Sequence, residues 1–113
     1  MHEMGITAGI IASVEDAAKE QGAKKINEVC ISIGDLTDIQ EFALQFAWEA
    51  LTPGTMAEGS ALVVTHVPGK SRCSVCNEEF EHDKYDLTCP KCDNFIVESL
   101  TGRELQIDTI DID

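Results

Sequence analysis

Two short stretches decide the fold of this 113-residue chain: Cys73-Ser-Val-Cys76 and Cys89-Pro-Lys-Cys92, which are separated by twelve residues. Each C-x-x-C pair can form a tight turn that aims both sulfurs inward, and two such turns facing each other place four thiolates in a tetrahedral array. Zinc prefers this coordination, so the spacing predicts a structural zinc ribbon whose ligands are Cys73, Cys76, Cys89 and Cys92. Because a site closed by four thiolates leaves no open position, we expect it to fold the segment and not to catalyse hydrolysis.

The same cysteines allow other interpretations. Iron in a rubredoxin-like site uses the same four ligands, and the sequence does not separate the two metals, although zinc is favoured. Disulfides are disfavoured in a reducing compartment, and a thioredoxin-like redox pair follows a strand and opens a helix, whereas these pairs flank turns. Cys30 lies apart from the four, and we expect it to be a small packed residue.

The segments on either side of the cysteines predict two helices and three strands. Apolar residues recur at helical spacing over 4–21 and 39–51, and they alternate with polar residues over 25–33. Segments 61–67 and 103–107 supply two more strands. This order predicts an α+β fold, in which a small three-stranded sheet with two helices packed on one face carries an inserted four-cysteine zinc ribbon.

We expect this fold to comprise two domains. Residues 1–68 together with 102–113 form the helix-and-sheet domain, and residues 69–101 form the inserted ribbon. Stretches below roughly 40 residues usually need a metal or disulfides to fold, so the ribbon is too short to hold itself together by apolar burial alone.

The second helix carries two rows of apolar side chains. One is a continuous stripe that comprises Ile39, Phe42, Ala43, Phe46, Ala47 and Ala50, and the other comprises Leu44, Trp48 and Leu51. For the second row we expect burial against a neighbouring element, with a docking stripe for a partner helix as the alternative. Asp38 or Thr37 is the expected N-cap of this helix.

Charge and hydropathy exclude several classes of function. The chain has 21 acidic and 8 basic residues, a net charge of −13, which disfavours generic binding to nucleic acid or to anionic membranes. Its apolar stretches are shorter than a membrane span and no secretory signal is visible, so we expect a cytoplasmic protein. The chain has no phosphate-binding Gly-Lys-Ser/Thr loop, and no Ser-His-Asp or Cys-His set whose spacing matches a catalytic motif. We therefore expect that it is not an enzyme.

The start of the chain offers a second metal site. His2 follows Met1 directly, and Met1 should be retained because its removal requires a small second residue. The α-amine, the amide nitrogen of His2 and its imidazole can then close fused chelate rings around one ion, and nitrogen ligands in a plane suit Ni(II) or Cu(II). A histidine next to the first methionine often has no function. The evidence for a metal site here therefore depends on the motifs in the rest of the sequence.

Several motifs follow one another along the chain: Met-His-Glu at 1–3, Ile33-Gly34-Asp35-Leu36, Phe46-Ala47-Trp48-Glu49, the two C-x-x-C pairs, and Ser99-Leu100-Thr101-Gly102-Arg103-Glu104-Leu105. Taken in this order, they closely resemble the motifs of the HypA/HybF family of accessory proteins for nickel insertion into nickel–iron hydrogenase. The resemblance implies a nickel metallochaperone, built as a nickel-binding α/β domain that carries an inserted zinc ribbon.

The resemblance also implies a ligand set and partners. Ni(II) is held by His2, by the backbone nitrogens of His2 and Glu3, and by the amine of Met1. The Glu3 side chain is expected to orient the imidazole from outside the ligand set, or else only to complement the helix dipole. The implied partners are the nickel-pathway GTPase HypB and the immature hydrogenase large subunit, and urease accessory machinery stays open as a further client.

The chain departs from the family at a few positions. Gln40 stands where many members carry an acidic residue, between Asp38 and Glu41, so this chain has no carboxylate at that position for nickel or partner binding. His82 lies between the C-x-x-C pairs and stays outside the expected ligand set, as a loop histidine. The rival function is a zinc-ribbon adaptor that binds proteins and no transferable nickel.

Overall fold

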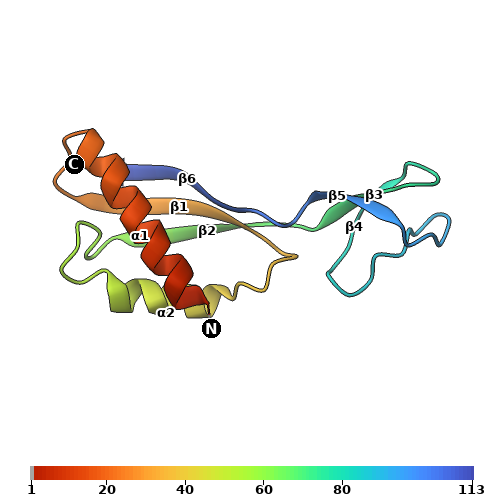
Figure 1. Cartoon of the computed structure of the whole chain (residues 1–113), viewed down its shortest axis with the longest axis horizontal. Helices are drawn as coiled ribbons and strands as arrows, with labels where there is room; N and C mark the ends of the chain where they lie inside the picture. The colour runs from red at the N-terminus through yellow and green to blue at the C-terminus, as the bar shows by residue number, and fades with distance from the viewer. Residues whose placement is uncertain (1) are drawn as a thin grey trace. The chain divides into compact units, whose positions relative to one another are not determined.

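The computed structural model describes residues 2–113, which form two compact units. The first, here the helical unit, comprises Met1–Ile31, Ile39–Thr65 and Gln106–Asp113, and the second, the ribbon unit, comprises Ser32–Asp38 and His66–Leu105. In chain order the elements are α1 (Glu3–Glu20), β1 (Ile26–Gly34), α2 (Glu41–Leu51), β2 (Ala61–Val67), β3 (Lys70–Cys73), β4 (Glu79–Glu81), β5 (Val97–Thr101) and β6 (Leu105–Ile112) (Figure 1).

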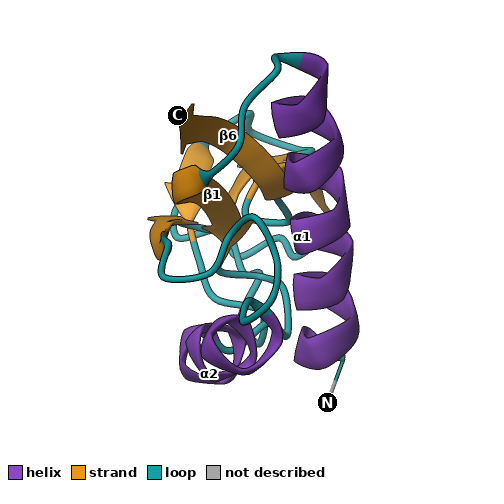
Figure 2. Ribbon diagram, turned by 90° about the vertical axis from the view of Figure 1, so that its left-hand side faces the viewer, coloured by secondary structure: helices purple, strands orange, loops and turns teal. Residues whose placement is uncertain are grey.

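The three-stranded sheet has the order β2-β1-β6, with β1 in the centre. Val29, Ile31 and Ile33 of β1 are buried, while Glu28 and Cys30, which alternate with them, are half-buried. This is the pattern of a strand that presents one face to helices. In Figures 1 and 2, α1 lies against the sheet and α2 lies beside the N-terminal end of α1. The predicted α+β fold, with two helices and a small sheet, is confirmed.

Helix α1 buries an apolar stripe and ends in a glycine turn. Ile10, Val14 and Ala18 are buried, as their spacing predicts. After the helix, Gly22 adopts a φ of 72° and donates to the carbonyl of Lys19, while the N–H of Ala23 reaches the carbonyl of Ala18. This pair of bonds is a Schellman motif, which explains the glycine at the expected stop. Within residues 2–113, no helix combines the length and the apolar character that crossing a membrane requires.

The N-terminus of α2 differs from the expectation. The helix begins at Glu41 with Gln40 as N-cap, and the predicted caps Asp38 and Thr37 are wrong. The hydroxyl of Thr37 instead donates to the carbonyl of Gly34 at 2.9 Å. The backbone N–H of Gln40 donates to Oε2 of Glu3 at 3.1 Å, so a carboxylate from the first turn of α1 satisfies the free end of α2.

The two apolar rows of α2 differ in how far their large side chains are exposed. Leu44 and Trp48 are buried, and the indole N–H of Trp48 donates to the hydroxyl of Ser60 at 3.1 Å, so the expected burial of this row is confirmed for these two residues, while Leu51 is half-buried. In the longer stripe Phe42 and Phe46 are 86% and 65% exposed. Helix α2 therefore packs into the unit through Leu44, Ala47 and Trp48 and leaves two phenylalanines uncovered.

The ribbon unit contains a second, antiparallel sheet with the order β4-β3-β5. Arg72 of β3 lies opposite Glu79 of β4 and Glu98 of β5, and its guanidinium bonds both carboxylates at 3.1 and 3.2 Å. The buried cluster of this sheet consists of Cys73, Phe80 and Cys89. With one aromatic and two cysteines, this core is too small to be stable by apolar burial alone.

Three glycines let segments that are distant in sequence approach closely in the ribbon unit. A Cβ on Gly34 would lie 2.0 Å from the carbonyl carbon of Gly102, and a Cβ on Gly69 would lie 2.6 Å from the side chain of Leu36. Gly102 has a φ of 115°, and its carbonyl accepts from the N–H of Leu36 at 2.7 Å. Two of the family-like motifs, around residues 33–36 and 99–105, thus meet in space.

Candidate metal sites

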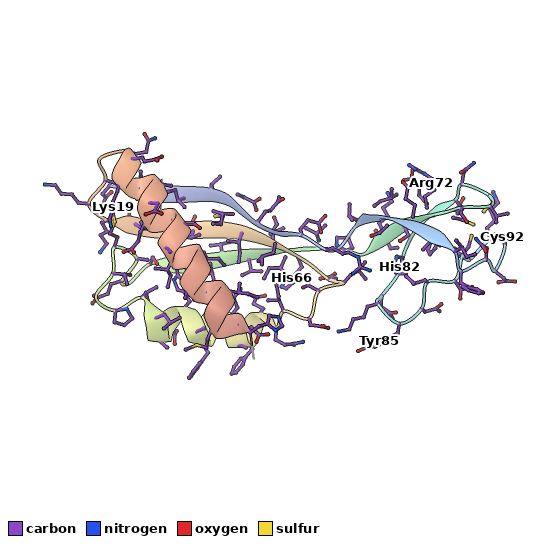
Figure 3. The ribbon with its side chains drawn as sticks, viewed as in Figure 1. Lys19, His66, Arg72, His82, Tyr85 and Cys92 are labelled. Atoms are coloured by element: carbon purple, nitrogen blue, oxygen red, sulfur yellow. The ribbon has the colours of Figure 1, made fainter. Side chains whose placement is uncertain are left out.

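The four cysteines predicted as zinc ligands come together in the ribbon unit. Their sulfur atoms all lie within 4.8 Å of one another, with Sγ–Sγ distances of 3.4 Å between Cys73 and Cys92 and 3.6 Å between Cys76 and Cys89. Four sulfurs at about 2.3 Å from a tetrahedral zinc are about 3.8 Å apart, so the cluster fits this ion. Figure 3 shows Cys92 among the sulfur atoms of the site.

Each C-x-x-C pair forms the same turn. The N–H of Asn77 donates to the carbonyl of Cys73 at 3.1 Å, and the N–H of Asp93 donates to the carbonyl of Cys89 at 3.0 Å. Asn77 and Asp93 have φ values of 64° and 62°, the left-handed conformation that asparagine and aspartate tolerate best after glycine. This role was not predicted from the sequence, although the signal is present there: an Asn or Asp directly follows the second cysteine of each pair.

Backbone N–H groups surround the sulfurs and favour thiolates. Val75 donates to Sγ of Cys73 and Lys91 donates to Sγ of Cys89, both at 3.4 Å. The N–H of Cys76, against the effect of burial and together with Val75, lowers the pKa of Cys73 to about 6. One thiol of the group is therefore ready to ionise near neutral pH, which metal binding requires.

The opposite side of the cluster resists a second negative charge. The N–H of Asn94 favours the thiolate of Cys92, yet the neighbouring Cys73 sulfur and burial outweigh it and raise the pKa of Cys92 to about 12. The pKa of Cys76 is also raised, because burial and the sulfurs of Cys89 and Cys73 outweigh the N–H of Glu78. Four thiolates at this spacing repel one another, and a divalent cation at their centre removes the repulsion.

The other candidate residues lie outside the cysteine cluster. Both ring nitrogens of His82 have partners, Nε2 at 2.6 Å from the hydroxyl of Ser71 and Nδ1 at 2.6 Å from the carbonyl oxygen of Asp83. His82 therefore has a structural role in the ribbon. Cys30 is half-buried on β1, where its thiol donates to Glu28, as expected for a packed residue.

The predicted nickel residues lie at the start of α1. His2 is exposed, and its carbonyl accepts from the N–H of Ile6 at 2.9 Å, which begins the helix. Glu3 is 4% exposed and holds the N–H of Gln40. The Met1 amine lies outside the described residues. At Gln40 the contacting group is the main-chain N–H, a partner that sequence patterns do not reveal because every residue except proline carries one.

Hydrogen bonds keep the Glu3 carboxyl ionised. Hydrogen bonds, among them the one from the N–H of Gln40, outweigh desolvation and lower the pKa of Glu3 to about 2. The side chain thus presents a permanent negative charge directly beside His2, at the junction of α1 and α2. A charge there can attract a cation and orient groups that bind one.

The sequence of this chain is similar to that of known proteins along its whole length. The family described as "Hydrogenase/urease nickel incorporation, metallochaperone, hypA" matches residues 1–112. The chain is 33% identical to the hydrogenase maturation factor HypA of Acidithiobacillus ferrooxidans, over the full length of both chains, and 36% identical to that of Chlorobium luteolum, over 100% of this chain and 97% of the relative.

A solved structure shares the fold. The solution structure of the nickel metallochaperone HypA from Helicobacter pylori matches 99% of this chain and 97% of its own, with a TM-score of 0.68 at 24% sequence identity. With a family match over almost every residue and a site that fits a structural zinc ion, the chain belongs to the HypA family of nickel-incorporation metallochaperones that act in hydrogenase maturation.

Proposed function

We propose that this protein carries Ni(II) at its N-terminal Met-His-Glu and delivers it, together with the GTPase HypB, to the large subunit of nickel–iron hydrogenase. The proposal rests on family membership and on one structural observation. The His2 carbonyl accepts from the N–H of Ile6 and the Glu3 side chain accepts from the N–H of Gln40, which holds this segment at the start of α1, while the His2 side chain is exposed.

The proposed ligands are mainly nitrogens of the main chain and of one side chain. They are the Met1 amine, the amide nitrogens of His2 and Glu3, and the His2 imidazole. Nitrogen donors in a plane suit Ni(II), and an exposed terminus lets the ion leave toward a partner. Since protons compete for the amine and the imidazole, nickel binding should weaken as pH falls.

The zinc ribbon has a separate task in this proposal. Four thiolates close the coordination sphere of zinc, so this ion stays in place and supports the fold of the ribbon. Nickel is cargo and zinc is a resident ion. Because all nucleotide chemistry belongs to the GTPase, the chaperone itself needs no catalytic residue and is not an enzyme.

The decisive experiment is a titration of Ni(II) into zinc-loaded protein with its native start, followed by calorimetry and by the visible spectrum. We expect one nickel ion per chain in the native protein and its loss in His2→Ala. The matched control is His66→Ala, because His66 is also exposed and pairs with Asp35 in the ribbon unit at 3.6 Å. Equal nickel binding by wild type and His2→Ala would overturn the proposed site and favour a zinc-ribbon adaptor without transferable nickel.

The role of the α-amine as a nickel ligand can be tested separately from that of His2. An uncleaved N-terminal tag should abolish the planar nickel spectrum while leaving the zinc ribbon folded. A tagged protein with an unchanged nickel spectrum would remove Met1 from the ligand set, even if His2 remained in it.

A further inference from the structure

The exposed row of α2 lines a groove at the N-terminal end of α1. The groove has a volume of about 480 Å³ and is lined by Glu3, Met4, Phe42, Ala43 and Phe46. Figures 1 and 2 agree that this end of α1 lies beside α2. Met4 is 45% exposed, in addition to the two phenylalanines, so the walls of the groove are apolar and open to solvent. We call it the Phe42–Phe46 groove.

The spacing of these residues matches a known mode of recognition. Phe42 and Phe46 are one helical turn apart and present their rings on the same side of α2. A groove between two helices with apolar side chains at this spacing is the shape that accepts an amphipathic helix, whose anchors also recur at i and i+4. Exposed aromatic side chains in one cluster mark interaction surfaces more often than isolated ones do.

Charge around the groove specifies the occupant. The sequence contains no Lys or Arg between Lys25 and Lys70, nor any before Lys19, so α2 and most of α1 lack basic residues. The carboxylate of Glu3 lines the groove from a buried position, bonded to the N–H of Gln40, and Glu49, which is exposed, follows Phe46 at i+3. An apolar surface with an acidic rim is complementary to an apolar stripe flanked by Lys and Arg.

The same charge argues against two other occupants. A second copy of this chain would bring an equally acidic rim against the first, and each chain carries a net charge of −13. An anionic membrane would be repelled for the same reason. A partner protein with a basic segment is the occupant that both the apolar walls and the rim favour.

We propose that the Phe42–Phe46 groove is a docking site for a basic amphipathic helix of a partner protein. Two apolar side chains one turn apart enter the groove, and a flanking Lys or Arg side chain pairs with the exposed Glu49. The groove is adjacent to the His2–Glu3 segment, so a partner docked here is held next to the proposed nickel ligands. The relevance of this adjacency to nickel rests on the proposed function, whereas the docking of a helix in the groove does not.

Three synthetic peptides of about 14 residues test the proposal with the zinc-loaded full chain. The first is a Leu–Lys amphipathic helix, the second replaces its lysines by glutamates, and the third replaces its leucines by serines. Fluorescence anisotropy of the labelled peptides measures affinity, and amide chemical shifts locate the binding site. We expect the Leu–Lys peptide alone to bind tightly and to shift signals of residues 3–4 and 42–49.

Variants separate the groove from general charge attraction. Phe42→Ser and Phe46→Ser should each weaken Leu–Lys binding at least tenfold without changing the circular dichroism spectrum or the Tm, because both rings are exposed. Glu49→Lys should weaken it and flatten its salt dependence. The control is Phe95→Ser, which removes a 72% exposed phenylalanine from the ribbon unit and should leave affinity unchanged.

Several outcomes would overturn the proposal. If the peptide with serines in place of leucines bound as tightly as the Leu–Lys peptide, or if Phe42→Ser left the affinity unchanged, binding would be explained by charge attraction alone. A wild-type dimer in sedimentation that Phe42→Ser dissociates would assign the groove to self-association, and co-sedimentation with phosphatidylglycerol vesicles that Phe42→Ser abolishes would assign it to a membrane. His2→Ala should abolish nickel binding and leave peptide affinity intact, so the two proposals fail independently.

Discussion

The helical unit and the ribbon differ in what holds them together. The helical unit buries large apolar side chains from both helices and the central strand, among them Val14, Ile26, Ile31 and Leu44, each at most 1% exposed. The β4-β3-β5 sheet of the ribbon buries one phenylalanine beside the cysteines. One region is stabilised by removing apolar surface from water, and the other depends on a metal ion to compensate for a small core.

The largest test of this difference is removal of the metal. A chelator, or Cys73→Ala, should unfold the ribbon and leave the helical unit folded, because structural zinc contributes roughly 10 kcal/mol to small domains of this kind. Amide spectra should then lose the ribbon signals only, and proteolysis should begin within the expected domain 69–101. If the helical unit unfolded at the same chelator concentration, the two regions would unfold as one cooperative unit, and the stability of the helical unit would also depend on the metal.

The converse change acts on the core of the helical unit. Leu44→Ala removes a fully buried side chain and should lower the free energy of unfolding by about 2–5 kcal/mol. Trp48, the single tryptophan of the chain, is 2% exposed in the same unit and reports its unfolding by fluorescence. Phe46→Ala is the matched control, since that side chain is exposed, and should change stability by less than about 0.5 kcal/mol. A cobalt-substituted ribbon should keep its thiolate charge-transfer band in both variants.

A glycine in each unit should respond oppositely to alanine. Gly34→Ala places a methyl group 2.0 Å from the backbone of Gly102 and should destabilise the protein by about 1–3 kcal/mol or more. Gly9→Ala lies within α1 with no atom within 4 Å of the new Cβ, and should stabilise it by roughly 0.5–1 kcal/mol. Thermal unfolding measures both. A tolerated Gly34→Ala would contradict the close approach of the two motifs.

The smallest expected effect is that of pH on the junction of the two helices. The pKa of Glu3 is about 2 in the folded chain and near 4.5 without its hydrogen bonds, so its stabilising contribution is complete above pH 4.5 and is lost as pH falls toward 2. Glu3→Gln should remove this part of the acid dependence in nickel-free protein, as followed by Trp48 fluorescence. Glu49→Gln is the control, and an identical acid profile for wild type and Glu3→Gln would contradict the capping role.

Local patterns predicted the elements of this fold well, and the errors have a common cause. Alternation identified β1, and the glycine after α1 marked its end. The cap of α2 was wrong because the carboxylate that satisfies it comes from Glu3, 37 residues earlier in the chain. A pattern that covers only a few neighbouring residues cannot contain both partners of such a bond.

What the sequence determined by itself are properties that depend on spacing within a few residues: the two C-x-x-C turns, the helical and alternating periods, and the ordered motifs of the family. Only the tertiary structure decided that Phe42 and Phe46 of the longer stripe stay exposed, since both rows of α2 consist of apolar residues at helical spacing. Leu44 and Trp48 are buried in the interior of the helical unit, whereas Phe42 and Phe46 are exposed to solvent. Burial depends on shape complementarity among distant segments, which one-dimensional periodicity does not encode.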